Sequence, residues 1–116
     1  MKKTTRLLKA LADENRLRIL ALLSAKEGLC VCEITEVIGL SQPTVSSHLK
    51  VLENAGLLEF KKEGLWVNYD ISSSLEKNTK AILDNVLGML SKSKEIKREL
   101  SRLSSINRKE ICSKRV

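Results

Sequence analysis

Two cysteines separated by one residue are the side chains of this sequence best suited to chemistry. Cys30 and Cys32 lie in the segment LCVCEI, and soft thiolates select ions such as As(III), Sb(III), Cd(II), Pb(II), Cu(I) or Zn(II). A helix advances about 100° per residue, so the two thiols would point about 200° apart in a regular helix. Binding one ion therefore requires Cys30 to lie outside the first turn, or that turn to unwind.

The rest of the chain offers few additional ligands, because it has only one more cysteine and one histidine. Zinc usually takes four ligands, and His48 is expected to face outward from a different helix. A pyramid of three sulfurs fits the cysteines better, with Cys112 as the third metal ligand. The alternative is that the thiols are small apolar residues of the core, where free cysteine is common.

The segment that follows the cysteines predicts a helix-turn-helix. A short apolar helix is expected over residues 31–38, ending at Gly39. A second helix begins after Ser41, a common N-cap residue. Its outward face is small and polar, as in a helix that reads duplex DNA in the major groove. We expect DNA contacts from Ser41, Gln42, Thr44, Ser46, Ser47, His48 and Lys50.

A β-hairpin is predicted directly after this second helix. The runs 57–62 and 65–71 are rich in β-prone residues, and the Glu-Gly pair between them suits a tight turn. Such a hairpin forms the wing of a winged helix. Basic residues near its tip would contact phosphate without reading sequence, and these are Lys61 and Lys62.

The remaining elements complete a mainly α fold with a small β-hairpin, a winged helix-turn-helix. Amphipathic helices are expected over 4–12, 13–25 and 72–91. The apolar stripe of the last is wide for so small a domain, so we expect a homodimer formed through the first and last long helices. We expect residues 1–91 to form the DNA-binding and dimerisation domain, and residues 92–116 a basic C-terminal helical extension or tail.

Composition narrows the class of protein. A chain of 116 residues, 42% of them hydrophobic, is enough for one modest core. No apolar run reaches the roughly 20 residues needed to cross a bilayer, and no signal sequence is recognised, so we expect a cytoplasmic protein without a membrane partner. An odd number of cysteines argues against a secreted disulfide framework.

Net charge and catalytic motifs are less informative. The chain carries a net charge of +7, but residues 91–116 hold nine basic and three acidic side chains, which account for +6. Bulk charge is therefore weak support for DNA binding. We do not expect an enzyme, because no His/Asp/Glu cluster, phosphate-binding loop or nucleophile with an adjacent base is recognised.

Three segments together resemble the ArsR/SmtB family of bacterial metal-responsive repressors: LKALADENRLRILALL, LCVCEI and LSQPTVSSHLKVLENAGLLEFKKEG. The likeness covers residues 5–90, and the CVC element resembles that of the arsenic-sensing members. It implies a winged-helix homodimer that binds double-stranded operator DNA without inducer and leaves it when a metalloid binds. As(III) or Sb(III) would be the inducer, with no permanently bound cofactor.

The resemblance also implies roles for individual residues. Cys30 and Cys32 match the first two thiols of the arsenic-binding motif, whereas Thr35 stands at the third position. Cys112, water or an exogenous thiol would then complete the coordination. The DNA-facing segment of the family matches Ser41, Gln42, Thr44, Ser46, Ser47 and His48, and its wing matches Lys61, Lys62 and Gly64.

The leading hypothesis is a transcriptional repressor that trivalent arsenic or antimony releases from its operator. Two alternatives keep the same fold. In one, the thiols respond to persulfide or peroxide; in the other, the inducer is cadmium or lead.

Overall fold

The order of the secondary structure elements is that of a winged helix followed by three further helices. The computed structural model describes the backbone of residues 1–115 and the side chains of residues 1–111. Its elements are α1 (Lys2–Leu11), α2 (Glu14–Ala25), α3 (Val31–Ile38), α4 (Gln42–Asn54), β1 (Leu58–Glu63), β2 (Trp66–Ile71), α5 (Lys77–Leu90), α6 (Lys94–Ser104) and α7 (Arg108–Arg115). The predicted mainly α fold with one hairpin is confirmed. None of the helices in this described part is long and apolar enough to cross a membrane.

Local sequence signals fix the helix boundaries. The Asp13 carboxylate accepts hydrogen bonds from the amides of Asn15 and Arg16 at 2.8 and 3.1 Å and so caps α2. Gly39 ends α3 in the left-handed region with a φ of 80°, which a residue with a Cβ adopts only with strain. The Ser41 hydroxyl accepts from the Thr44 amide at 3.3 Å and begins α4.

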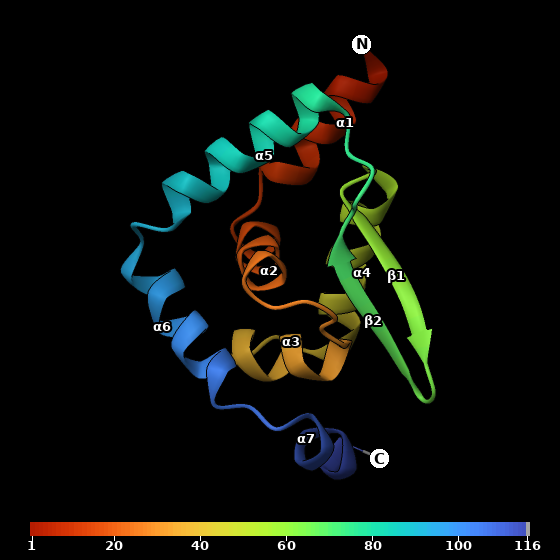
Figure 1. The fold of residues 1–116 in the computed structure, drawn as a ribbon, viewed down its shortest axis with the longest axis vertical. Coiled ribbons are helices and arrows are strands. Elements are labelled where there is room, and N and C mark those ends of the chain that lie inside the picture. The colour runs from red at the N-terminus through yellow and green to blue at the C-terminus, as the bar shows by residue number, and fades with distance from the viewer. Residues whose placement is uncertain (116) are drawn as a thin grey trace.

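The core is centred on α2, which lies inside an arc formed by α5, α6 and α7 (Figure 1). Ile19, Leu20 and Leu22 of this helix are at most 1% exposed. They belong to one hydrophobic cluster with apolar side chains of α1, α3, α4, α5, α6 and the base of the wing, including Leu7, Ile34, Val37, Val45, Leu49, Leu52, Leu58, Leu83 and Leu103. The cluster therefore fixes α3 and α4 against a common support.

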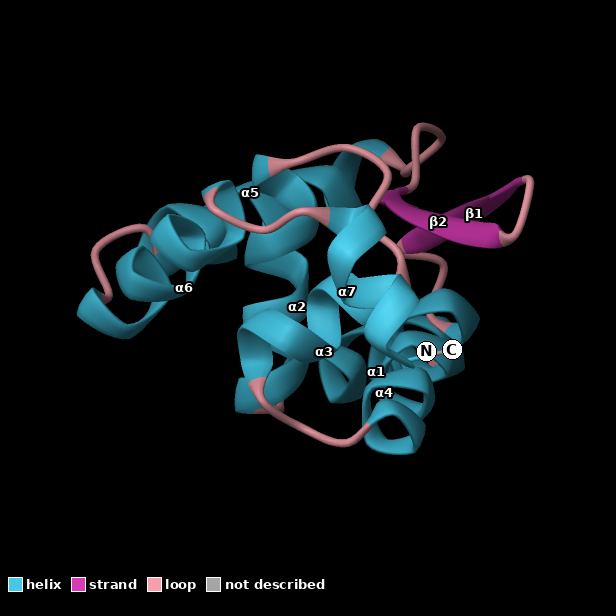
Figure 2. Cartoon of the chain, turned by 90° about the horizontal axis from the view of Figure 1, so that it is seen from below, coloured by secondary structure: helices cyan, strands magenta, loops and turns pink. Residues whose placement is uncertain are grey.

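The wing is the antiparallel pair β1–β2, and it projects from the helical body (Figure 2). The register pairs Lys61 with Asn68 and Lys62 with Val67. An isolated bridge between Leu29 and Tyr69 adds the loop before α3 to the same sheet. The wing is therefore hydrogen-bonded to the segment that leads into the cysteines.

The helix after the wing begins later than predicted. The expected N-cap lay within residues 72–74, but the N-cap is Glu76 and α5 begins at Lys77. The intervening serines are used by the wing instead, because the Ser72 amide donates to the Leu57 carbonyl at 2.8 Å and the Ser73 amide donates to the Glu59 carboxylate at 3.1 Å.

The basic C-terminal segment packs on α2 and α3. From α6, Arg102 donates to the carbonyls of Val37 and Glu36 at 2.9 and 2.8 Å. Arg18 of α2 donates to the Glu99 carboxylate of α6 at 2.5 Å and to the Ile38 carbonyl at 3.1 Å. The last carbonyls of α3 are thus held by guanidinium groups of two other helices. These contacts cross the domain division predicted at residue 91, which stays a prediction.

Candidate functional site

The outward face of α4 consists of small polar side chains. Ser41, Gln42, Thr44, Ser46, Ser47 and Lys50 are all exposed. On the opposite face, Val45, Leu49 and Leu52 are at most 1% exposed and pack into the core. Short polar side chains let a helix approach base edges closely. The structure therefore brings six of the seven predicted α4 residues together on one accessible surface.

His48 is the exception, because it is half-buried rather than directed fully outward. Arg16 Nη1 lies 3.3 Å from His48 Nδ1. Since a guanidinium only donates, Nδ1 is the acceptor of this contact. Arg16 is itself fixed by the carbonyls of Lys9 and Ala10, at 2.9 and 2.8 Å. His48 therefore ties α4 to the end of α1. Within the described residues, Nε2 of His48 has no hydrogen-bond partner.

Val51 is an exposed residue of α4 that the sequence analysis did not single out. It is 38% exposed and lies seven residues after Thr44 and four after Ser47, so all three share one side of the helix. An apolar side chain on this face can contact a thymine methyl group in the major groove. In the sequence, the seven-residue spacing of Val51 from Thr44 indicates that the two side chains share one side of the helix.

The two wing lysines lie on opposite faces of β1, because successive side chains alternate along a strand. Lys62 shares its face with Tyr69. Burial and the nearby charge of Glu53, a residue of α4, raise the pKa of Tyr69 above its ordinary value, so this face lies toward α4. Lys61 instead lines a hollow of about 510 Å³ together with Glu33 and Arg108. Both lysines are exposed, but only Lys62 is on the side of α4.

Cys30 lies outside the first turn of α3, which is one of the two arrangements that would let both thiols bind one ion. Cys30 is the N-cap of α3, with φ −89° and ψ 166°, and therefore lies outside the regular helix. Its side chain is buried, whereas Cys32 in the first turn is half-buried. The two thiols are thus not held 200° apart by helical geometry.

Glu33 is a buried carboxylate beside the thiols that sequence reasoning did not assign to the site. It accepts a hydrogen bond from the Cys30 amide at 3.1 Å and two from Arg108, from Nε at 2.9 Å and from Nη2 at 2.7 Å. Lys26 Nζ lies 3.7 Å from its other oxygen. Burial alone would raise the pKa of Glu33, but the Cys30 amide and the Arg108 charge hold it below its ordinary value. In the sequence, the three-residue spacing of Cys30 and Glu33 is that of a capping box, which indicates that Glu33 contacts the backbone of Cys30.

Arg108 connects the last helix to the loop before α3. Besides Glu33, its guanidinium donates to the Gly28 carbonyl and lies 5.0 Å from the centre of the Trp66 ring. Cys112 stands four residues later in α7, and its side chain lies outside the described residues. In the part of the chain with described side chains, no three His, Cys, Asp or Glu residues form a metal-binding group.

Thr35 occupies the position one turn after Cys32. It is 4% exposed, and its hydroxyl has no hydrogen-bond partner among the described residues. The position that would carry a third thiol is therefore enclosed by protein and holds a hydroxyl without a described hydrogen bond.

The comparisons with known proteins agree with this arrangement. Residues 13–59 match the family model of bacterial regulatory proteins of the arsR family. The arsenical resistance operon repressor of Escherichia coli K12 is 40% identical over 109 residues, which cover 92% of this chain and 93% of that protein. A homolog of the cadmium resistance transcriptional regulatory protein CadC from Staphylococcus aureus is 41% identical over 63 residues, covering 54% of this chain and 52% of that protein.

A solved structure shows the same architecture. The homodimeric winged helix-turn-helix DNA-binding domain of Mb0332 from Mycobacterium bovis, described as a possible ArsR-family transcriptional regulator, matches with a TM-score of 0.66 and 29% sequence identity. The match covers 80% of this chain and 82% of that chain. The matched helix-turn-helix and the Escherichia coli relative, which aligns over nearly the whole chain, place this protein in the ArsR family of winged helix-turn-helix transcriptional repressors.

Proposed function

We propose that this repressor binds its operator as a homodimer and is released when As(III) or Sb(III) binds Cys30 and Cys32. The observation that carries the proposal is the placement of Cys30 as an extended N-cap immediately before the helix that holds Cys32. Two thiolates in this arrangement can converge on one soft ion. The name of the Escherichia coli relative supports arsenic as the inducer.

The exposed face of α4 and the wing would contact the operator. The small polar residues of α4 suit base-edge readout in the major groove, and Lys62 on the same side suits a phosphate contact. The positions that would contact DNA remain Ser41, Gln42, Thr44, Ser46, Ser47, His48, Lys50, Lys61 and Lys62, with His48 acting through Nε2.

The thiols are attached to both DNA-contacting elements. Cys30 begins α3, which leads through Gly39 into α4, and its neighbour Leu29 is bridged to the wing at Tyr69. Drawing the two sulfurs together on an ion would therefore displace α3, the wing or both. An inducer that binds such a displaced conformation more tightly lowers operator affinity by that difference in binding free energy.

Cys112 of the same chain is the third ligand in this proposal. Its helix α7 begins at Arg108, which contacts Gly28 and Glu33 on either side of the thiol pair within one protomer. This docking supports a ligand from the same subunit over one from the partner.

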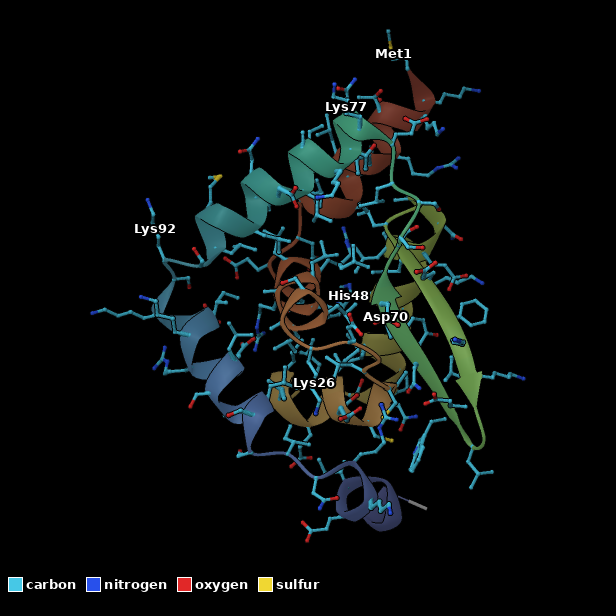
Figure 3. All side chains as sticks on the ribbon, in the orientation of Figure 1. Met1, Lys26, His48, Asp70, Lys77 and Lys92 are labelled. Atoms are coloured by element: carbon cyan, nitrogen blue, oxygen red, sulfur yellow. The ribbon has the colours of Figure 1, made fainter. Side chains whose placement is uncertain are left out.

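The homodimer would form through α1 and α5. These helices begin at the same end of the molecule, where Figure 3 marks Met1 and Lys77. Leu8 of α1 is 52% exposed and Met89 of α5 is 73% exposed, so both helices carry apolar surface that a second copy could bury. A two-fold dimer presents two copies of α4 to successive half-sites of an operator.

The test is an arsenite titration of the protein bound to DNA from its own promoter. Wild type should release the DNA, whereas Cys30→Ser and Cys32→Ser should need at least about tenfold more arsenite, a change of about 1.4 kcal/mol in binding free energy. Cys112→Ser should need an arsenite concentration between that of wild type and those of the other two variants. Ser101→Ala, at an exposed position on α6, is the control. Unchanged release from both Cys30→Ser and Cys32→Ser would overturn the thiol mechanism.

The same assay distinguishes the competing inducers. The cadmium-related homolog motivates a parallel titration with Cd(II) and Pb(II). Release by either ion at lower concentration than arsenite would replace arsenic as the inducer. Mass spectrometry after mild peroxide treatment addresses the redox alternative, and a disulfide that lowers operator affinity without any added ion would favour it.

A further inference from the structure

Three cations line one side of α1 without an acidic partner. Lys2, Arg6 and Lys9 are spaced at i, i+4 and i+7, so they lie along one face of the helix, and all three are exposed. Within the described residues none of them forms an ion pair, whereas Lys3 of the same helix pairs with Glu76 at 3.3 Å. Unpaired cations in a row leave this face with uncompensated positive charge.

The cations border a hollow that reaches the reading helix. A depression of about 530 Å³ is lined by these three residues together with Met1, Thr5, Ala10, Arg16 and Val51. Its described lining contains no acidic side chain. Val51 belongs to the exposed face of α4. Arg16 of α2 contacts His48, which is also in α4, at 3.3 Å. The positive surface therefore continues directly from the surface proposed to face DNA.

This cationic face is separate from the proposed dimer face of α1. Leu8, the exposed apolar residue, lies about 100° or more around the helix axis from Lys2, Arg6 and Lys9. Leu7, Ala10 and Leu11 occupy the buried side. A partner protomer seated on Leu8 would thus leave the cations accessible.

Helix α1 lies on the opposite side of α4 from the tip of the wing (Figure 1). The tip of the hairpin points toward one end of the molecule, whereas α1 lies at the other end, with α4 between them (Figure 1). A DNA duplex that contacts α4 and the wing would extend along α4 toward α1. Near the proposed dimer interface, this stretch of DNA would lie between the two half-sites.

We propose that Lys2, Arg6 and Lys9 form a second phosphate-binding surface, which holds the DNA backbone beside the C-terminal half of α4. This inference rests on the proposed operator binding and adds a contact element to it. Such contacts are sequence-independent and act through release of counterions from the DNA. They would position α4 on the duplex from the side opposite the wing.

The test is the salt dependence of operator affinity. Binding of the wild-type dimer to its promoter duplex is measured by fluorescence anisotropy between about 50 and 200 mM salt. Lys2→Gln, Arg6→Gln and Lys9→Gln are made singly and together, because glutamine removes the charge and retains helix propensity. Each position contributes two contacts per dimer, so each variant should lower the slope of log affinity against log salt by about 1.8. The ratio of operator to random-sequence affinity should not change.

Matched variants separate a local contact from bulk charge. Lys94→Gln and Lys97→Gln remove the same charge from exposed positions on α6 and should leave the slope unchanged. The conservative pair Arg6→Lys and Lys9→Arg should retain the wild-type slope. A wild-type slope in the triple variant, or an equal loss in the α6 controls, would overturn the inference while leaving operator binding intact. If wild type fails to bind any promoter duplex, the proposed function itself is wrong.

Discussion

Leu29 and Tyr69 exchange both of their backbone hydrogen bonds, with the Leu29 amide 3.2 Å from the Tyr69 carbonyl and the Tyr69 amide 2.8 Å from the Leu29 carbonyl. The residue next to Cys30 therefore forms a one-residue β-bridge to the edge of the wing. The Gly28 amide adds a bond to the Asp70 carboxylate at 2.6 Å. The loop that carries the first thiol and the wing consequently form one hydrogen-bonded unit.

The pair Glu33–Arg108 should make a measurable contribution to stability. Among the described side chains, Arg108→Met leaves the 2% exposed Glu33 with Lys26 as its charged partner, at 3.7 Å. We expect the free energy of unfolding to fall by about 3 kcal/mol, since removing one partner leaves a buried charge. The double variant Glu33→Gln/Arg108→Met should recover part of that loss. Urea denaturation measures both, with exposed Arg98→Met as the control. Equal stability of the single and double variants would contradict the pairing.

Thr35→Cys should restore a local three-thiol site. The substitution replaces a buried hydroxyl that has no hydrogen-bond partner with a thiol of similar size, so stability should be maintained. Arsenite should release the DNA at lower concentration, and a further Cys112→Ser substitution should then have no effect. Thr35→Ser is the control. If Cys112→Ser still raises the arsenite requirement in the Thr35→Cys protein, the position does not supply a ligand.

Lys62 should contribute more to operator affinity than Lys61. The two exposed lysines are adjacent and chemically identical, but only Lys62 shares a face of the wing with Tyr69 on the side of α4. We expect Lys62→Gln to lower the salt-dependence slope by about 1.8 per dimer, and Lys61→Gln, on the other face of the strand, to lower the slope by less. Anisotropy titrations of both variants provide the comparison. Equal slopes would contradict this assignment.

The charge of Asp13 should make stability depend on pH at the acidic end. Burial would raise the pKa of Asp13, but the Arg16 amide and charge, with His48 and the Asn15 amide, hold it below its ordinary value. A lowered folded-state pKa contributes stability above the ordinary pKa, and this contribution is lost as pH falls through the folded-state pKa. The free energy of unfolding of Asp13→Ala at neutral pH should therefore be about 1 kcal/mol lower than that of wild type, and this loss includes the N-cap hydrogen bonds.

The acidic limit supplies the check on this assignment. Urea unfolding across pH gives the free energy of unfolding of wild type and of Asp13→Ala. The difference between these two free energies should narrow below the ordinary pKa of an aspartate. Asp13→Asn retains the cap and should lose only the charge contribution. A difference that is constant from neutral to acidic pH would rule out the ionic contribution.

The helices, the hairpin and the exposed polar face of α4 could be predicted because their signals are local. The N-caps Asp13 and Ser41 and the C-terminal Gly39 lie within a few residues of the boundaries they set. The outward polar face of α4 follows from helical period alone. A partner distant in sequence changes such a prediction, as for His48, which periodicity directs outward but Arg16 holds partly buried from 32 residues away.

The surroundings of the thiols could not be predicted for the same reason. Glu33 is bound by Arg108, 75 residues further along the chain, and no periodic pattern records that contact. Arg102 and Arg108 read in the sequence as part of a basic segment, yet both donate to backbone carbonyls of the α3 region. Side-chain type alone does not distinguish a solvated arginine from one that fastens two helices.

The guanidinium contacts at the end of α3 have a mechanical consequence. Arg102 and Arg18 hold the carbonyls of Glu36, Val37 and Ile38, so this end of the helix serves as a pivot. The opposite end begins at Cys30, and a short displacement there would tilt the axis of α3 about the pivot rather than unwind it. Because Gly39 and Leu40 join the pivot to α4, such a tilt would make α3 a lever that passes a movement at Cys30 on to α4.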